Sequence, residues 1–196
     1  MNPRATDPAA FAAGYAGRLS SLLGSQDWSG VARLAEDLQE CLRSRRQVFL
    51  CGNGGSAGNA IHLANDLLYG VSKMPGQGLR VTALAANPSV VTCLANDLGY
   101  DAVFSAQLAV LANPGDVLVV LSGSGNSPNV LAALERAQAL GVTSYAILGY
   151  DGGKALGMAE VPIHFAVDDM QLSEDLQLVV GHMIMQWLYE NRADRG

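Results

Sequence analysis

The stretch that most limits the possible folds of this chain runs from Gln47 to Gly70. A short apolar segment, residues 47–51, stops at the sequence Gly52-Asn53-Gly54-Gly55-Ser56, and the chain then continues with helical spacing. This pattern predicts a buried parallel strand that passes through a tight loop into a helix. Backbone N–H groups in such a loop, together with the positive end of the helix dipole, favour an anion such as a phosphate.

A second stretch repeats this arrangement with more hydroxyl groups. The aliphatic run Val117–Leu121 is the clearest buried strand in the chain, and Ser122-Gly123-Ser124-Gly125-Asn126-Ser127-Pro128 follows it directly. Ser127 is a good N-cap residue and Pro128 suits the first helical position, so a helix begins at the end of this loop. Serine hydroxyls add hydrogen-bond donors without adding charge, which suits a small sugar phosphate.

The rest of the sequence alternates between helix and strand signals, which predicts an α/β fold with a parallel sheet covered on both faces. Five strands with right-handed crossovers favour the flavodoxin-like order 2-1-3-4-5, which places the loops after strands one and three side by side. We expect two N-terminal helices in residues 1–45 and the sheet domain in residues 46–196, within one structural unit. The other predicted elements are strands Leu79–Leu84, Ser144–Leu148 and Val161–Val167 and helices Ser89–Asn96, Val103–Leu111, Pro128–Leu140 and about Glu174–Glu190, with a loop over Tyr69–Gly78.

Composition narrows the kind of partner this chain can have. The formal charge is −6, and the one basic cluster, residues 43–46, resembles the last turn of a helix, so we expect no nucleic-acid partner. No apolar run approaches the length of a membrane span, and no signal peptide is evident, so we expect a cytoplasmic protein without a membrane partner.

Charged residues make up only 15% of the chain, which favours oligomerisation, with the first helix packing on a neighbouring subunit. Three cysteines without metal-binding spacing indicate reduced, mostly buried thiols.

Histidines and carboxylates supply the candidate chemistry. His62 and Asp66 stand four residues apart and share one helix face, although an isolated pair of this kind is often only a surface contact. Glu174 and His182 share a face of the last helix, but about 12 Å of helix separates their backbones. Both could reach one metal only if Glu174 lay at or before the helix start. His182 could also be a neutral core residue, and we interpret His164, in the last strand, as structural.

Neither glycine loop has the lysine of a nucleotide-triphosphate loop or the spacing of a dinucleotide-binding loop. Taken together with Asn96-Asp97 and Gly149-Tyr150-Asp151-Gly152-Gly153, the two loops resemble the sugar isomerase (SIS) domain family, with the phosphoheptose isomerase branch as the closest match. The resemblance implies a homotetramer with active sites between subunits, and a zinc-assisted conversion of sedoheptulose 7-phosphate to D-glycero-D-manno-heptose 7-phosphate. The substrate-binding residues that it implies are Asn53, Gly54, Gly55, Ser56, Asn96, Asp97, Ser122, Gly123, Ser124, Ser127 and Glu174.

The same resemblance implies a zinc site formed by His62, Asp66, Glu174 and His182, with Asp66 as the catalytic base and His182 as its acid/base partner. Two positions depart from the family pattern: Asp66 stands where those isomerases carry glutamate, and Glu174-Asp175 stands where they carry glutamine followed by glutamate. An aspartate reaches about 1.5 Å less far, and an added carboxylate weakens a cation as a Lewis acid. Two alternatives therefore stay open: an isomerase for a different phosphosugar, or a non-catalytic SIS module that binds a sugar phosphate or a protein such as a replication initiator.

Overall fold

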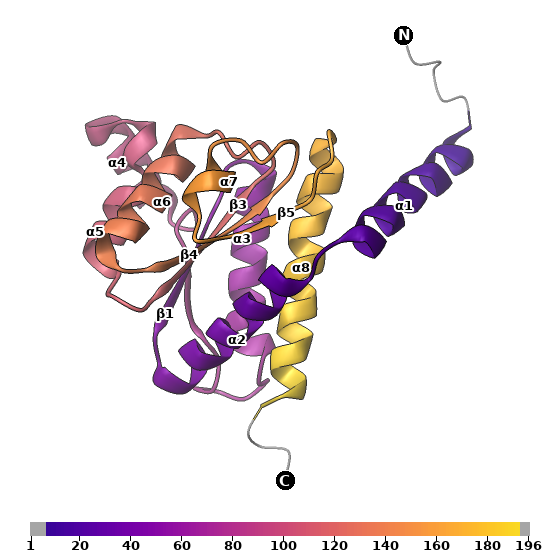
Figure 1. Ribbon diagram of the computed structural model, residues 1–196. Coiled ribbons are helices and arrows are strands. Elements are labelled where there is room, and N and C mark those ends of the chain that lie inside the picture. Colours follow the sequence, from indigo (N-terminus) through magenta and orange to yellow (C-terminus); the bar gives the residue numbers. More distant parts are fainter. Residues whose placement is uncertain (1–6, 193–196) are drawn as a thin grey trace.

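The fold is a five-stranded sheet between two layers of helices, with one N-terminal helix extending away from it (Figure 1). The structure is a computed structural model that describes residues 7–192. The strands are β1 (Gln47–Cys51), β2 (Arg80–Ala83), β3 (Val117–Ser122), β4 (Thr143–Leu148) and β5 (Val161–His164). The helices are α1 (Pro8–Ser25), α2 (Ser29–Ser44), α3 (Gly55–Asn65), α4 (Pro88–Leu98), α5 (Ser105–Leu111), α6 (Pro128–Leu140), α7 (Ala155–Met158) and α8 (Met170–Glu190), with a π-helical turn η1 (Asp66–Gly70) and a 3-10 turn η2 (Tyr100–Ala102).

All strand pairs are parallel, and the order β2-β1-β3-β4-β5 confirms the arrangement predicted from the sequence. Cys51, the last residue of β1, pairs in register with Val120 of the neighbouring strand β3. The loops that follow these two strands therefore leave the sheet side by side at its carboxyl end. Open α/β sheets bind their ligands at this point of the fold.

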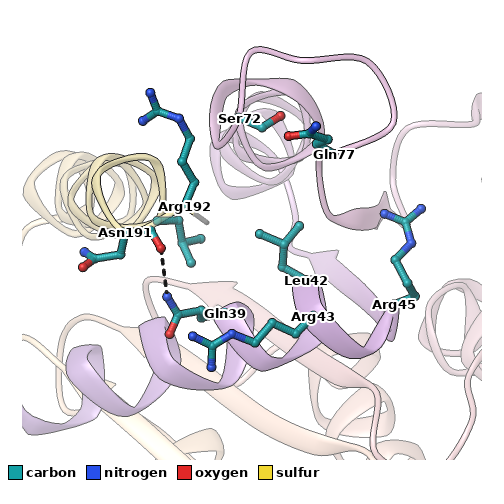
Figure 2. A pocket seen from close by; sticks show the side chains of 9 residues that line it. Gln39, Leu42, Arg43, Arg45, Ser72, Gln77, Asn191 and Arg192 are labelled. Atoms are coloured by element: carbon teal, nitrogen blue, oxygen red, sulfur yellow. Dashed lines mark hydrogen bonds between the residues drawn. The ribbon is translucent and has the colours of Figure 1, made fainter. Parts of the chain in front are cut away.

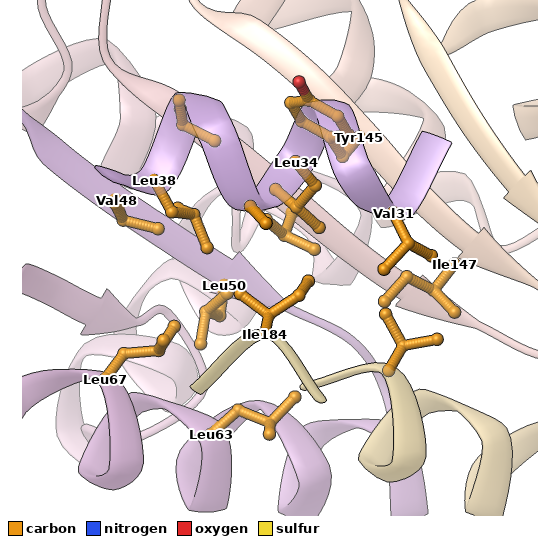
Figure 3. Packing of buried hydrophobic residues seen from close by; sticks show 14 of the residues in the cluster. Val31, Leu34, Leu38, Val48, Leu50, Leu63, Leu67, Tyr145, Ile147 and Ile184 are labelled. Atoms are coloured by element: carbon orange, nitrogen blue, oxygen red, sulfur yellow. The ribbon is translucent and has the colours of Figure 1, made fainter. Parts of the chain in front are cut away.

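The central strand β3 contributes side chains to the hydrophobic core on both faces of the sheet. All six of its residues are buried, and alternate side chains point to opposite faces of the sheet. Leu121 lies in the cluster formed with α2, α3 and α8, and Leu118 lies in the cluster formed with α4, α5, α6 and α7. Figure 3 shows the first cluster, in which Leu34 of α2 and Leu63 of α3 approach Ile184 of α8. The apolar sequence of β3 is thus the sequence of a strand covered on both faces.

The two N-terminal helices differ in how they relate to this core. α2 buries five residues on the sheet, and the carboxylate of Asp27 accepts a hydrogen bond from the backbone N–H of Ser29 at its start. None of the residues of α1 is buried, and the helix contacts α8 through polar groups: Tyr15 donates to Asp175, and Arg18 pairs with Asp169 at 2.8 Å. Burial and the bond to Asp175 raise the pKa of Tyr15 to about 12. Leu19, Leu22 and Leu23 at the C-terminal end of α1 are partly buried against the core cluster, whereas Phe11 near its start is 59% exposed.

Most predicted boundaries lie within two residues of the observed ones, and two differ by more. The last helix begins at Met170 rather than at Glu174, because the carboxylate of Asp169 accepts hydrogen bonds from the backbone N–H groups of Gln171 and Leu172. The prediction missed this N-cap, and Glu174 therefore lies inside the second turn of α8. The last strand ends at His164, three residues before the predicted end. In the described part of the chain, no helix is both long enough and apolar enough to span a membrane.

Candidate active site

A pocket of about 260 Å³ lies between the two glycine-serine loops. Residues from the first loop, the second loop and the first turns of α8 line it. Nine of the predicted substrate-binding residues line this pocket together with Leu121 and Met170: Asn53, Gly54, Gly55, Ser56, Ser122, Gly123, Ser124, Ser127 and Glu174. Among the described residues that form the lining, none is a lysine or an arginine. Any anion bound there depends on N–H and O–H donors.

The serine hydroxyls of the pocket are oriented by the protein. Ser56 accepts a hydrogen bond from the side-chain amide of Gln177 at 3.0 Å, and Ser122 accepts one from the backbone N–H of Gly125 at 3.1 Å. Ser124 accepts one from the backbone N–H of Asn126 at 3.3 Å. Because each oxygen already accepts an N–H, its own hydroxyl proton is available to be donated elsewhere. The pocket thus presents several neutral donors, as the sequence predicted.

Two glycines show why these loops require residues without a Cβ atom. A Cβ on Gly52 would lie 2.7 Å from the carbonyl oxygen of Leu121 in the neighbouring strand. Gly125 has a φ of +64°, and a Cβ there would lie 2.0 Å from the carbonyl oxygen of Gly152. Both neighbours are backbone atoms, so neither can move aside without moving the loop. Gly52 thus keeps the first loop close to the end of β3, and Gly125 keeps the second loop close to the segment that follows β4.

Three predicted residues take positions that the sequence alone did not define. Glu174 places its carboxylate directly against Gly55, at the start of α3, where a Cβ would lie 2.4 Å from either carboxylate oxygen. Asn96 and Asp97 lie at the exposed end of α4, where the amide of Asn96 donates to the carboxylate of Asp97 at 2.8 Å. They are not among the residues that line the pocket.

A second group of side chains lies farther along α3 and α8. The Nε2 atoms of His62 and His182 are 2.9 Å apart, and the Oδ2 atom of Asp66 lies 3.3 Å from the first and 3.4 Å from the second. Among the described residues, these three form the one group whose donor atoms could hold a metal ion. The side chain of Asp66 is 19% exposed and the two imidazoles are about half exposed, so solvent reaches the group from one side.

Close packing between α3 and α8 brings these histidines together across 120 residues of sequence. A Cβ on Gly181 would lie 2.2 Å from the side chain of Leu63, so any other residue at this position would require that side chain to move. Asp66 begins the π-helical turn that follows α3. Turns of this type are frequent at functional sites, because the wider turn changes the direction of a side chain.

The donor atoms fit a zinc ion. Imidazole nitrogen and carboxylate oxygen are common zinc ligands, and bonds of about 2.0–2.1 Å in a tetrahedral arrangement place neighbouring ligand atoms about 3.3 Å apart. The separations of 3.3 and 3.4 Å from Asp66 to the two imidazoles match this spacing, and the 2.9 Å between the two imidazole nitrogens is about 0.4 Å shorter. Along α3, seven residues separate Gly55 from His62, which corresponds to about 10 Å of helix. The helix α3 therefore contributes to the pocket at its start and, about 10 Å farther along, to the His62–Asp66–His182 group.

Sequence reasoning missed a set of polar residues that support the pocket. Gln177 is only 1% exposed; its amide donates to Ser56, and it accepts a hydrogen bond from Asn59 at 2.9 Å. Asn59 also donates to the backbone carbonyl of Glu174 at 3.0 Å. The sequence did contain a signal for this role, because Gln177 is a polar residue among the apolar positions of the last helix. Two further residues, Asn129 and Tyr100, contact Asn53.

A different cavity, of about 320 Å³, lies at the opposite end of the sheet (Figure 2). Arg43, Arg45 and Arg192 line it, near the C-terminal ends of α2 and α8. Arg45 donates to the carbonyl oxygens of Gly76 and Gly78, and Arg192 stacks on the ring of Tyr189. Cations are favourable at helix C-termini, so these arginines are accounted for by the structure itself.

Comparison with known proteins agrees with this geometry. A family model described as SIS domain matches residues 12–149. The chain is 39% identical to the phosphoheptose isomerase of Chlorobaculum parvum over 88% of its own length and 83% of that protein, and 38% identical to the phosphoheptose isomerase of Akkermansia muciniphila over 86% of both. The structure of phosphoheptose isomerase GmhA from Neisseria gonorrhoeae superimposes with a TM-score of 0.84 at 30% identity, covering 93% of this chain and 98% of that one.

The chain belongs to the sugar isomerase (SIS) domain family, the class of protein that this fold and these two loops define. Within the family its relatives are phosphoheptose isomerases, and the chain is an aldose–ketose isomerase of that type.

Proposed function

We propose that this enzyme converts sedoheptulose 7-phosphate to D-glycero-D-manno-heptose 7-phosphate. The observation that carries the proposal is the placement of a donor-lined pocket and the His62–Asp66–His182 group about 10 Å apart along α3. This spacing suits a substrate whose phosphate and carbonyl lie at opposite ends of a carbon chain. The relatives named as phosphoheptose isomerases support the choice of a seven-carbon sugar.

Asp66 is proposed as the catalytic base. It removes a proton from C1 of the ketose while the carbonyl oxygen at C2 gains one, and the same exchange in reverse leaves a proton on C2 and a carbonyl at C1. His182 lies 3.4 Å from Asp66 and moves the proton between the two oxygens. The second loop and the start of α3 hold the phosphate, so that the reacting carbons lie at the carboxylate.

His62, Asp66 and His182 are the residues we propose to hold a zinc ion. When bound, zinc would polarise the substrate oxygens as a Lewis acid. Glu174, which the sequence placed in the same ligand set, lies against Gly55 in the pocket. This position favours a substrate-binding role for Glu174 over a role as fourth ligand. Asn96 and Asp97 stay predicted substrate-binding residues from the family pattern, as neighbours of the first loop.

We also propose that the protein is a cytoplasmic homotetramer with active sites at subunit interfaces. α1 has no buried residue, and its Phe11 is 59% exposed. Trp28, Met183 and Trp187 line an apolar groove of about 310 Å³ between α2 and α8. Both surfaces would be covered by a second copy of the chain. Light scattering on the full chain and on a variant that lacks residues 1–25 measures the oligomeric state; a smaller assembly is expected for the truncated chain.

Turnover of sedoheptulose 7-phosphate, followed by proton NMR, tests the reaction. Asp66→Asn removes the base while keeping the shape of the side chain, and should lower kcat by about 10²–10⁴-fold. An Asp66→Asn enzyme within tenfold of the wild type would exclude Asp66 as the base. The absence of product with zinc supplied would remove the heptose assignment.

Metal content separates the enzyme from the alternative of a non-catalytic SIS module. The His62→Ala variant should lose the zinc that the wild type retains through purification without chelator. His164→Ala is the matched control, because His164 contacts the backbone carbonyl of Tyr150 at 3.0 Å, away from the cluster. Equal zinc in the His62→Ala and wild-type proteins would exclude this site, and a wild type with neither zinc nor turnover would support the binding module.

A further inference from the structure

The two substrate loops are joined by a closed pair of side-chain hydrogen bonds. The amide nitrogen of Asn53 in the first loop donates to the amide oxygen of Asn129 at 2.8 Å, and the amide nitrogen of Asn129 donates back to the oxygen of Asn53 at 2.9 Å. Asn129 is the second residue of α6, directly after the second loop, and it is only 1% exposed. The loops are therefore connected through one buried amide.

A third segment of the fold also forms a hydrogen bond with the side-chain amide of Asn53. The hydroxyl of Tyr100 donates to the amide oxygen of Asn53 at 3.0 Å. Tyr100 belongs to η2, which follows the helix that carries Asn96 and Asp97. The oxygen of Asn53 thus accepts two hydrogen bonds from two different parts of the fold, while the Tyr100 side chain remains 54% exposed.

These bonds define the direction of the Asn53 amide. With Asn129 in its observed orientation, rotating the Asn53 amide by a half-turn would place nitrogen against nitrogen and oxygen against oxygen across the pair, so donor would face donor and acceptor would face acceptor. The Tyr100 hydroxyl would also have to change from donor to acceptor. In the observed orientation one N–H of Asn53 is used by Asn129, and the amide keeps a second N–H. Because Asn53 lines the pocket, this remaining donor has a defined direction there.

We propose that Asn129 and Tyr100 are positioning residues for the substrate pocket: they act through Asn53 by fixing its amide as a donor to the bound ligand and by holding the two loops at one separation. The proposal rests on the proposed function for the identity of the ligand. Neither residue lines the pocket, but both hydrogen-bond to Asn53, which does. The step that depends on Asn53 is binding of the ligand, whereas the proposed proton transfers occur at Asp66, in the group that begins at His62, about 10 Å along α3 from Gly55.

The test compares Tyr100→Phe, Asn129→Ala and the double variant with the wild type. The measurements are KM and kcat for sedoheptulose 7-phosphate, the dissociation constant of inorganic phosphate by calorimetry, and the urea midpoint. Tyr100→Phe, which removes one hydroxyl from an exposed side chain, should raise KM and the phosphate dissociation constant about three- to tenfold with kcat within twofold. Asn129→Ala should raise both constants by more and also lower the urea midpoint. Tyr189→Phe and Asn191→Ala, both at the far end of α8, are the matched controls and should leave both constants unchanged.

The double variant provides the sharpest outcome. Because both residues act on one oxygen of Asn53, their effects on phosphate binding should be less than multiplicative. Multiplicative effects, or a lower urea midpoint in Asn129→Ala with both binding constants within twofold of the wild type, would overturn the proposal and leave Asn129 as a structural residue only. Phosphate calorimetry does not depend on turnover, so the two hypotheses can fail separately. If the heptose assignment is wrong, the wild type will not turn over sedoheptulose 7-phosphate. If this inference is wrong, the variants will bind phosphate as the wild type does.

Discussion

Removing the charge of Glu174 should strengthen the binding of phosphate. The pocket is lined by neutral donors and by this one carboxylate, with no lysine or arginine among the described lining residues. A sphere of about 260 Å³ is about 8 Å across, so a phosphate in the pocket lies within about 8 Å of the carboxylate. Repulsion between charges of −1 and −2 at that distance is about 1 kcal/mol in water and about 4 kcal/mol at an effective dielectric constant of 20.

The pocket is open to solvent, so we take the lower part of this range, about 1–2 kcal/mol. The Glu174→Gln variant should then bind inorganic phosphate about 5–30 times more tightly in calorimetry at low ionic strength, because 1.4 kcal/mol corresponds to a factor of ten. The advantage should shrink at 1 M salt, where the screening length is about 3 Å. Asp175→Asn is the control: it removes the same charge from the next residue of α8, whose carboxylate accepts a hydrogen bond from Tyr15.

Weaker or unchanged phosphate binding in Glu174→Gln would refute this reasoning, since it would mean that the carboxylate does not oppose the anion. The zinc content of the same variant tests the ligand assignment independently. Because Glu174 lies outside the three-residue cluster, the variant should retain zinc, and loss of zinc would restore Glu174 as a ligand.

Two further predictions concern the stability and reactivity of the chain. Burial raises the pKa of the Cys51 thiol to about 12 and the pKa of the Cys41 thiol to about 11, whereas Cys93 is exposed. Iodoacetamide at pH 8 should therefore modify one thiol in the native protein and three in urea. Mass spectrometry counts the modified thiols. Asp169→Ala removes the N-cap of α8 and should lower the free energy of unfolding by about 1 kcal/mol at pH 7. The backbone N–H of Leu172 lowers the pKa of Asp169 below its ordinary 3.8, so its contribution is present at neutral pH and is lost as the pH falls through that lowered pKa. Urea titrations should therefore show that the difference in free energy of unfolding between the wild type and Asp169→Ala disappears below about pH 4. A difference that does not change with pH would contradict the capping role.

Much of the pocket could be predicted because its determinants are local. A buried strand followed by a glycine-serine loop and a helix start is visible in consecutive residues, and the strand order then places two such loops together. His62 and Asp66 share a helix face by spacing alone. The start of α8 was predicted four residues late because the cap at Asp169 was not recognised, although an aspartate before a helical segment is a known signal.

The sequence by itself determined the sheet order, the two loops and the chemical types of the site residues, since these follow from periodicity and from residues close together in the chain. Only the tertiary structure decided that His182 meets His62, that Glu174 faces Gly55 rather than the histidines, and that Asn129 holds Asn53. The physical reason is that helical spacing defines which face a side chain occupies but not how far one helix slides or rotates against another. Here that position depends on contacts such as Gly181 against Leu63, between residues more than a hundred positions apart.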